Sequence, residues 1–139
     1  MLRLLPILAI AMATPVAAAT LDCKDPAGDL NYLEIVETYD EATGVYGLVS
    51  AKFKIMDELG YTSAKDPSND GDVTFVNVKQ DIENLSFDMH LLNVEKGYDT
   101  IVGSVRLFRA YEGSQVGIGG TLHAGGGGAF GVACTERAS

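Results

Sequence analysis

The residues with the clearest chemical pattern in this sequence lie in an acidic stretch near the middle of the chain. Oxygen-bearing side chains occupy alternate positions there: Asp66, Ser68, Asp70 and Asp72. Gly71 precedes the last of them and permits a sharp turn. Calcium prefers about six to eight oxygen ligands. The stretch therefore predicts a calcium site, with a further carboxylate such as Asp57 or Glu58 supplied by the same connection.

Residues 66–74 resemble the first part of an EF-hand loop, in which oxygen ligands alternate and a glycine stands at the sixth position. The twelfth position holds Asn77, where the EF-hand has a bidentate glutamate, and the flanking residues are typical of strands. Asn-Asp-Gly is also a common turn sequence. A solvated acidic turn is therefore the alternative interpretation.

Nothing in the sequence assigns a catalytic residue. His90 and His123 are the only histidines, and neither lies in a G-x-S-x-G or H-E-x-x-H motif. Two histidines are too few for a typical zinc site if both cysteines form a disulfide. The sequence therefore favours a protein that is not an enzyme and that has no cofactor other than calcium.

One short segment combines arginine with aromatic residues, and these types are frequent at the centres of protein interfaces. Its members are Arg106, Phe108, Arg109 and Tyr111. They predict a surface that binds a protein partner. The alternative is ordinary strand packing with surface arginines.

The N-terminus has the pattern of a secretory signal. Arg3 precedes an apolar run, and Ala17, Ala18 and Ala19 give a small-residue cleavage site. We expect cleavage after Ala19, which leaves residues 20–139 as a single β domain in the periplasm or outside the cell. Cys23 is too far from this site for a lipoprotein, and the apolar run is shorter than the roughly 20 residues of a membrane span.

Export places the only two cysteines, Cys23 and Cys134, in an oxidising compartment. They predict one intramolecular disulfide that closes nearly the whole mature chain. A loop of this length stabilises the fold by about 4–5 kcal/mol in the chain-entropy model. The bond also requires the first and last strands to lie close together.

Period-two alternation of apolar and polar residues predicts an all-β protein. The fold is a single antiparallel meander of about seven strands, closed by the terminal disulfide into a small barrel or a two-layer sandwich. A long polar connection is expected at 57–72, and a hairpin tip at 125–128. The seven strands are expected at residues 30–38, 45–55, 73–79, 85–91, 100–111, 116–122 and 130–135.

The charge balance bears on the partner. The chain has 10 Lys+Arg against 19 Asp+Glu, a net charge of −9. Cleavage after Ala19 removes one cation, Arg3, and takes this charge to −10. Such a surface repels nucleic acid and suits a basic protein.

We therefore expect an exported binding module, for example an inhibitor of a basic cell-wall hydrolase. Its plan of short exported strands tied by terminal cysteines is similar to that of small periplasmic lysozyme inhibitors, whose motifs are absent. The alternatives are a small calcium-binding structural or adhesive module that uses residues 66–72, and a β-barrel that holds a small apolar ligand. The sequence leaves the oligomeric state open.

Overall fold

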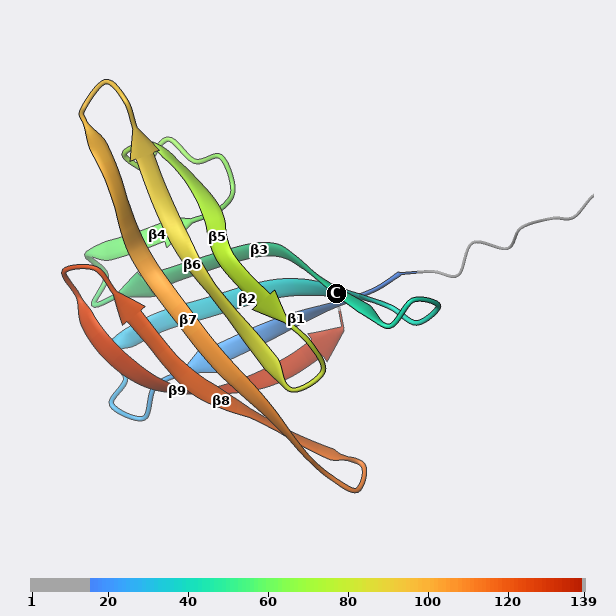
Figure 1. Cartoon of the computed structure of the whole chain (residues 1–139). Coiled ribbons are helices and arrows are strands. Elements are labelled where there is room, and N and C mark those ends of the chain that lie inside the picture. Colours follow the sequence, from blue (N-terminus) through green and yellow to red (C-terminus); the bar gives the residue numbers. More distant parts are fainter. Residues whose placement is uncertain (1–15, 139) are drawn as a thin grey trace, which may run out of the picture.

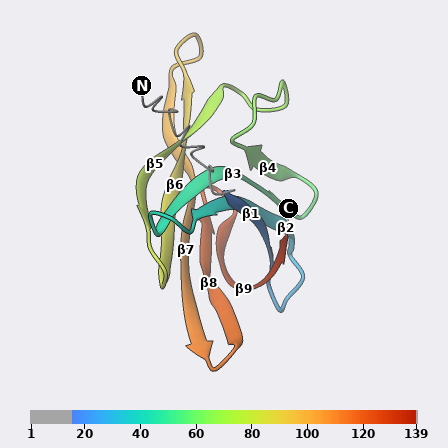
Figure 2. The same cartoon turned by 90° about the vertical axis from the view of Figure 1, so that its right-hand side faces the viewer.

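The computed structural model describes residues 16–138, and within this range the chain is all-β, without a helix. It forms one antiparallel sheet that is nearly closed into a barrel (Figures 1 and 2). The strands are β1 (Ala17–Lys24), β2 (Leu30–Asp40), β3 (Val45–Ile55), β4 (Leu59–Thr62), β5 (Asp72–Gln80), β6 (Asn84–Asn93), β7 (Tyr98–Glu112), β8 (Gln115–Ala124) and β9 (Gly128–Ala138).

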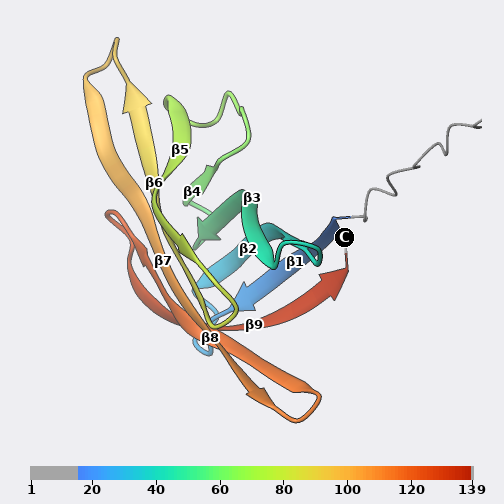
Figure 3. The same ribbon diagram turned by 45° about the vertical axis from the view of Figure 1, so that its right-hand side comes forward.

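The strand order across the sheet is β4-β3-β2-β1-β9-β8-β7-β6-β5. Consecutive strands pair as hairpins along most of the sheet, and β1 pairs with both β2 and β9. The segments that carry Cys23 and Cys134 are thus neighbours, as the sequence predicts, although the first of the seven expected strands, β2, is separated from β9 by β1. The two edge strands, β4 and β5, are consecutive in the chain and lie on either side of an opening in the barrel wall (Figure 3).

The number of strands explains this opening. Because every strand is antiparallel to its neighbour, the first and ninth strands of the order run in the same direction. Closing the wall would require a parallel ladder between β4 and β5, and β4 has only 4 residues. The barrel therefore remains open at this point.

The seven expected strands are all present, each at least as long as predicted, as β2, β3 and β5 to β9. The count is nevertheless nine. β1 spans the expected cleavage site and the residues after it, which belong to none of the seven expected strands, and β4 lies inside the connection expected at 57–72. The hairpin tip expected at 125–128 is confirmed as the turn between β8 and β9, where Gly126 and Gly128 have positive φ.

The predicted disulfide between Cys23 and Cys134 is present. Cys23 and Cys134 face each other in the register of β1 and β9, which are already joined by a ladder. The disulfide therefore reinforces a closed part of the wall. The sheet edges lie elsewhere, at β4 and β5, so the barrel that this disulfide pins is nearly rather than fully closed.

The middle of the barrel is filled by side chains. Phe53 of β3 and Phe87 of β6 are fully buried, and the ring of Phe53 points toward Gly103 of β7. A Cβ at Gly103 would lie 2.7 Å from Cε1 of Phe53, so this glycine makes room for the ring. Apolar side chains of β3 and β6 thus meet the wall of β7 in the middle of the barrel.

The predicted signal falls mostly on residues 1–15, outside the described part of the chain. Its expected cleavage site after Ala19 lies within β1. No helix among residues 16–138 is long and apolar enough to cross a membrane.

Candidate binding site at the barrel mouth

One end of the barrel contains a cavity of about 400 Å³. The turns β2–β3, β5–β6 and β7–β8 lie at this end, together with the start of β1 and the end of β9; we call it the barrel mouth (Figure 1). Residues of six strands line the cavity: Ala17, Ala18, Ala19, Glu37, Thr38, Tyr39, Tyr46, Arg109, Tyr111, Val116, Glu136 and Ala138.

The innermost lining residues are an ion pair. Glu37 continues the inward face of β2 after Leu33 and Ile35, and Arg109 continues that of β7. Nη2 of Arg109 donates a hydrogen bond to Oε1 of Glu37, and their side chains are 4% and 5% exposed, respectively. Because two charges lose their hydration here, the pair must be fully hydrogen-bonded to persist.

Strand β5 and the turn after it supply the remaining bonds. Nε2 of Gln80 donates to Oε2 of Glu37 at 2.8 Å, and Nη1 of Arg109 lies 3.5 Å from the carbonyl oxygen of Asp81. Both carboxylate oxygens of Glu37 therefore accept a hydrogen bond. This polar cluster, Glu37, Arg109 and Gln80, joins β2 and β7 to the edge strand β5.

Three tyrosines form the aromatic walls. The rings of Tyr39 and Tyr46 have centroids 4.7 Å apart, and the guanidinium of Arg109 lies 5.3 Å from the centroid of Tyr46. The hydroxyl of Tyr111 donates to the carbonyl oxygen of Ile82 at 3.0 Å. Burial, with a further contribution from Tyr111, raises the pKa of Tyr46, although Arg109 acts in the opposite direction. The hydroxyl of Tyr46 is therefore neutral at pH 7.

The mouth also carries unpaired negative charge. Glu136 lines the cavity from β9, and its side chain forms no ion pair or hydrogen bond with any of residues 16–138. More carboxylates stand at the surrounding strand ends and turns: Asp40, Glu41, Asp81, Glu83 and Glu112. The cavity thus combines aromatic rings with an acidic rim.

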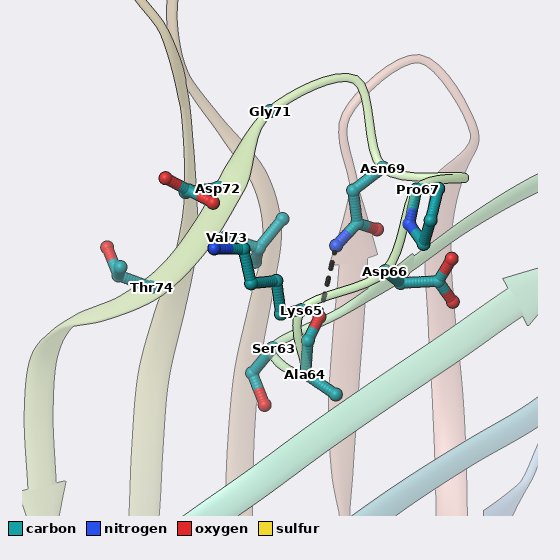
Figure 4. A pocket seen from close by; sticks show the side chains of 10 residues that line it. All are labelled: Ser63, Ala64, Lys65, Asp66, Pro67, Asn69, Gly71, Asp72, Val73 and Thr74. Atoms are coloured by element: carbon teal, nitrogen blue, oxygen red, sulfur yellow. Dashed lines mark hydrogen bonds between the residues drawn. The ribbon is translucent and has the colours of Figure 1, made fainter.

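The acidic loop expected to bind calcium lies at the other end of the barrel, between β4 and β5 (Figure 4). Its carboxylates have separate roles. Oδ1 of Asp66 accepts the Ser68 amide at 2.8 Å, which lowers the pKa of Asp66, whereas Asp70 pairs with Nζ of Lys96 at 2.5 Å. The side chain of Asp72 lies on the side of the loop away from Asp66 (Figure 4).

Asn69 holds this loop in shape. Its side-chain amide donates to the carbonyl oxygens of Thr62 at 2.8 Å and Ala64 at 3.4 Å, and its Oδ1 accepts the Thr62 amide. No three His, Cys, Asp or Glu residues of the described range gather where they could hold a metal. Calcium binding remains a prediction, which a thermal unfolding scan with and without calcium would test.

The predicted arginine and aromatic segment is divided between the two faces of β7. Arg106 and Phe108 point outward, where Arg106 pairs with Asp88 and Phe108 is 63% exposed. Arg109 and Tyr111 point inward and belong to the mouth. The structure therefore does not bring these four residues together on one surface.

The two histidines lie apart from the mouth. Nε2 of His90 is 2.5 Å from Oδ1 of Asp99 on the neighbouring strand β7. His123 is exposed on β8, opposite Ser104 and Ala129 in the ladders. Neither histidine lines the cavity.

Sequence reasoning did not single out Glu37, Tyr39, Tyr46 or Glu136. A signal for two of the mouth residues was nevertheless present. Glu37 follows Leu33 and Ile35 at period two, and Arg109 follows Val105 and Leu107 in the same way. A charged residue that continues the apolar face of a strand indicates a buried charge, and two of opposite sign indicate a pair.

Comparisons with protein-family models, with curated proteins and with solved structures find no match to this chain. The site therefore has to be interpreted from its own geometry and charge.

Proposed function

We propose that the chain is an exported binding module that recognises a basic protein through the barrel mouth. The observation that carries this proposal is the meeting of a tyrosine-lined cavity with unpaired acidic residues at one end of the barrel. Tyrosine is enriched at the centres of interfaces, and complementary charge directs the approach of a partner.

The distribution of the positive charges supports the proposal. Most lysines and arginines of residues 16–138 are already paired with a carboxylate: Lys52, Lys54, Lys96, Arg106, Arg109 and Arg137. The excess acidic residues are therefore not neutralised within the described chain. Among residues 16–138, one cation near the mouth is unpaired. It is Lys79, which lies in β5 just before the β5–β6 turn.

A protein partner fits the site better than a small apolar ligand. The barrel interior is occupied by Phe53, Phe87 and their neighbours, so the cavity is confined to the end of the barrel. Its entrance is surrounded by projecting turns, which a second protein can contact together with the cavity. Inhibition of a basic cell-wall hydrolase is one concrete form of this function.

The test uses the oxidised protein as an exporting host releases it. Calorimetry measures its binding to hen egg-white lysozyme and to a panel of other basic proteins. We expect at least one complex whose Kd rises with salt, and an acidic protein of similar size should not bind. Lysis of cell-wall suspensions by the lysozyme then tests for inhibition.

Two charge-reversal variants locate the surface. Glu41→Lys with Glu112→Lys changes the mouth, whereas Glu58→Lys with Glu95→Lys makes the same change in net charge on turns at the opposite end. We expect the first variant to weaken binding much more than the second. Equal effects, or no binding to any basic protein at low salt, would contradict the proposed function.

A further inference from the structure

We infer that the mouth cavity receives a single lysine or arginine side chain of the partner, which is held between tyrosine rings and the carboxylate of Glu136. This inference rests on the proposed function and specifies its anchor. The cavity, at about 400 Å³, falls in the range of sites that enclose a specific group.

The mouth already contains one cation held in this manner. Arg109 lies against the Tyr46 ring and pairs with Glu37. A guanidinium or ammonium on the face of an aromatic ring is attracted by the ring, more strongly when water is excluded. Tyr111 and Glu136 supply a second ring and a second carboxylate to the lining, and both are exposed, unlike Glu37 and Arg109.

Charge decides which group enters this part of the cavity. The charges of Glu37 and Arg109 offset each other at the inner end, so Glu136 leaves the lining of the cavity with a net negative charge. An anionic group would meet that carboxylate without a free cation beside it in the lining. A side chain with an apolar stem and a cationic end fits the rings and the carboxylate together.

Three lining residues stand before the predicted cleavage site. Ala17, Ala18 and Ala19 pair with Tyr39, Thr38 and Glu37 along β2. Cleavage after Ala19 would remove this part of β1 from the edge of the cavity and widen its entrance. The experiment therefore uses the chain as it is released by an exporting host, with its N-terminus determined.

Two matched pairs of variants test the anchor against the basic protein that binds best. Glu136→Gln and Glu112→Gln each remove one negative charge, but only Glu136 lines the cavity. We expect Glu136→Gln to weaken binding about tenfold or more, as for the loss of a charge-assisted hydrogen bond, and Glu112→Gln to have a much smaller effect. Tyr111→Leu removes the ring and should weaken binding, whereas Tyr111→Phe keeps it and should not.

Nα-acetyl-arginine amide and Nα-acetyl-lysine amide serve as probes, and we expect at least one of them to compete with the partner at millimolar concentration. Nα-acetyl-glutamine amide should not compete.

Thermal unfolding of each variant verifies that the fold is intact. The anchor is contradicted if Glu136→Gln and Glu112→Gln weaken binding equally and Tyr111→Leu leaves binding unchanged. In that case the proposal that the chain recognises a basic protein still holds. If the wild-type chain binds no basic protein, both proposals fail.

Discussion

The barrel is held together by different chemistry on its two sides. At the β1–β9 seam, the disulfide between Cys23 and Cys134 joins strands that a ladder already pairs. At the opening between β4 and β5 no ladder exists, and the polar cluster of Glu37, Arg109 and Gln80 connects β5 to β2 and β7.

These two connections act on different states of the chain. The disulfide closes a loop with a sequence separation of 111, and it stabilises mainly by restricting the unfolded chain. The polar cluster exists only in the folded chain, where its hydrogen bonds must offset the lost hydration of two charges. The stabilisation by the disulfide therefore does not depend on its place in the barrel. The polar cluster instead holds β2, β5 and β7 in position at the inner end of the mouth cavity.

The largest expected effect comes from removing the covalent connection. The variant Cys23→Ser with Cys134→Ser should lose about 4–5 kcal/mol of unfolding free energy, because the unfolded chain regains its freedom. Urea unfolding of the oxidised wild type and of the variant measures this difference. A loss below about 1 kcal/mol would mean that the loop-closure account is wrong for this chain.

Breaking the polar cluster on one side should have the next largest effect. Glu37→Gln leaves the buried guanidinium of Arg109 without its counter-charge, and we expect a loss of about 3 kcal/mol in the same unfolding experiment. The side chain keeps its size, so the loss reports on charge rather than on a cavity.

A double variant provides the control for this change. Glu37→Leu with Arg109→Met replaces both charges by apolar groups, and such replacements are often neutral in stability. We expect its stability to approach that of the wild type and its binding of the basic partner to be weaker, because Arg109 no longer holds the Tyr46 wall. A double variant as unstable as Glu37→Gln would show that the cluster contributes stability in its own right.

The two connections also differ in how far the sequence predicts them. The cysteines identify their bond because only one pairing is available within the chain. Alternation locates β3 and β6, but the 4 residues of β4 are too few to show a period, and β1 coincides with a signal-like alanine run. The count of nine strands, and with it the place of the opening at β4, depended on these two strands.

The mouth was harder to predict than the fold. Its lining comes from six strands, so the cavity exists only once their order and register are fixed. Arg109 and Tyr111 were selected for their types, but the alternation of β7 separates them from Arg106 and Phe108. The acidic loop illustrates the reverse case: a local spacing typical of a calcium site, whose side chains bond to Ser68 and Lys96 in the folded chain.

A smaller effect is expected for the residue that extends the cluster across the opening. Gln80→Leu removes the only side chain of β5 that donates to Glu37 within the described residues, while Arg109 continues to neutralise the carboxylate. We expect a loss of about 1.5 kcal/mol, typical of one hydrogen bond to a charged group. Hydrogen exchange of β5 amides should show the change locally, and Lys79→Leu on the same strand serves as the control. Equal exchange in the two variants would show that the bond across the opening does not hold β5.

The smallest expected effect on stability comes from a change in the hydrogen bonds on the outer face of β5. Asp88 of β6 accepts hydrogen bonds from Asn77 of β5 at 2.8 Å and from Arg106 of β7 at 2.8 Å. Burial raises the pKa of the Asp88 carboxyl, but the bonds from Asn77, Arg106 and Ser104 outweigh it and hold the pKa below its usual value.

A depressed carboxyl pKa gives stability that is present above the pKa of the unfolded chain, about 3.9, and is lost as pH falls through the folded value. We therefore expect Asp88→Asn to lower the Tm slightly at pH 7 and to reduce the fall in Tm between pH 5 and pH 2, as measured by circular dichroism. Asp72→Asn on β5 is the control, because the Asp72 side chain forms no ion pair or hydrogen bond with the described residues. If Asp88→Asn leaves the fall in Tm between pH 5 and pH 2 unchanged, the hydrogen bonds from Asn77 and Arg106 to Asp88 do not hold the edge strand. The polar cluster on the inner face is then the main connection between β5 and the rest of the barrel.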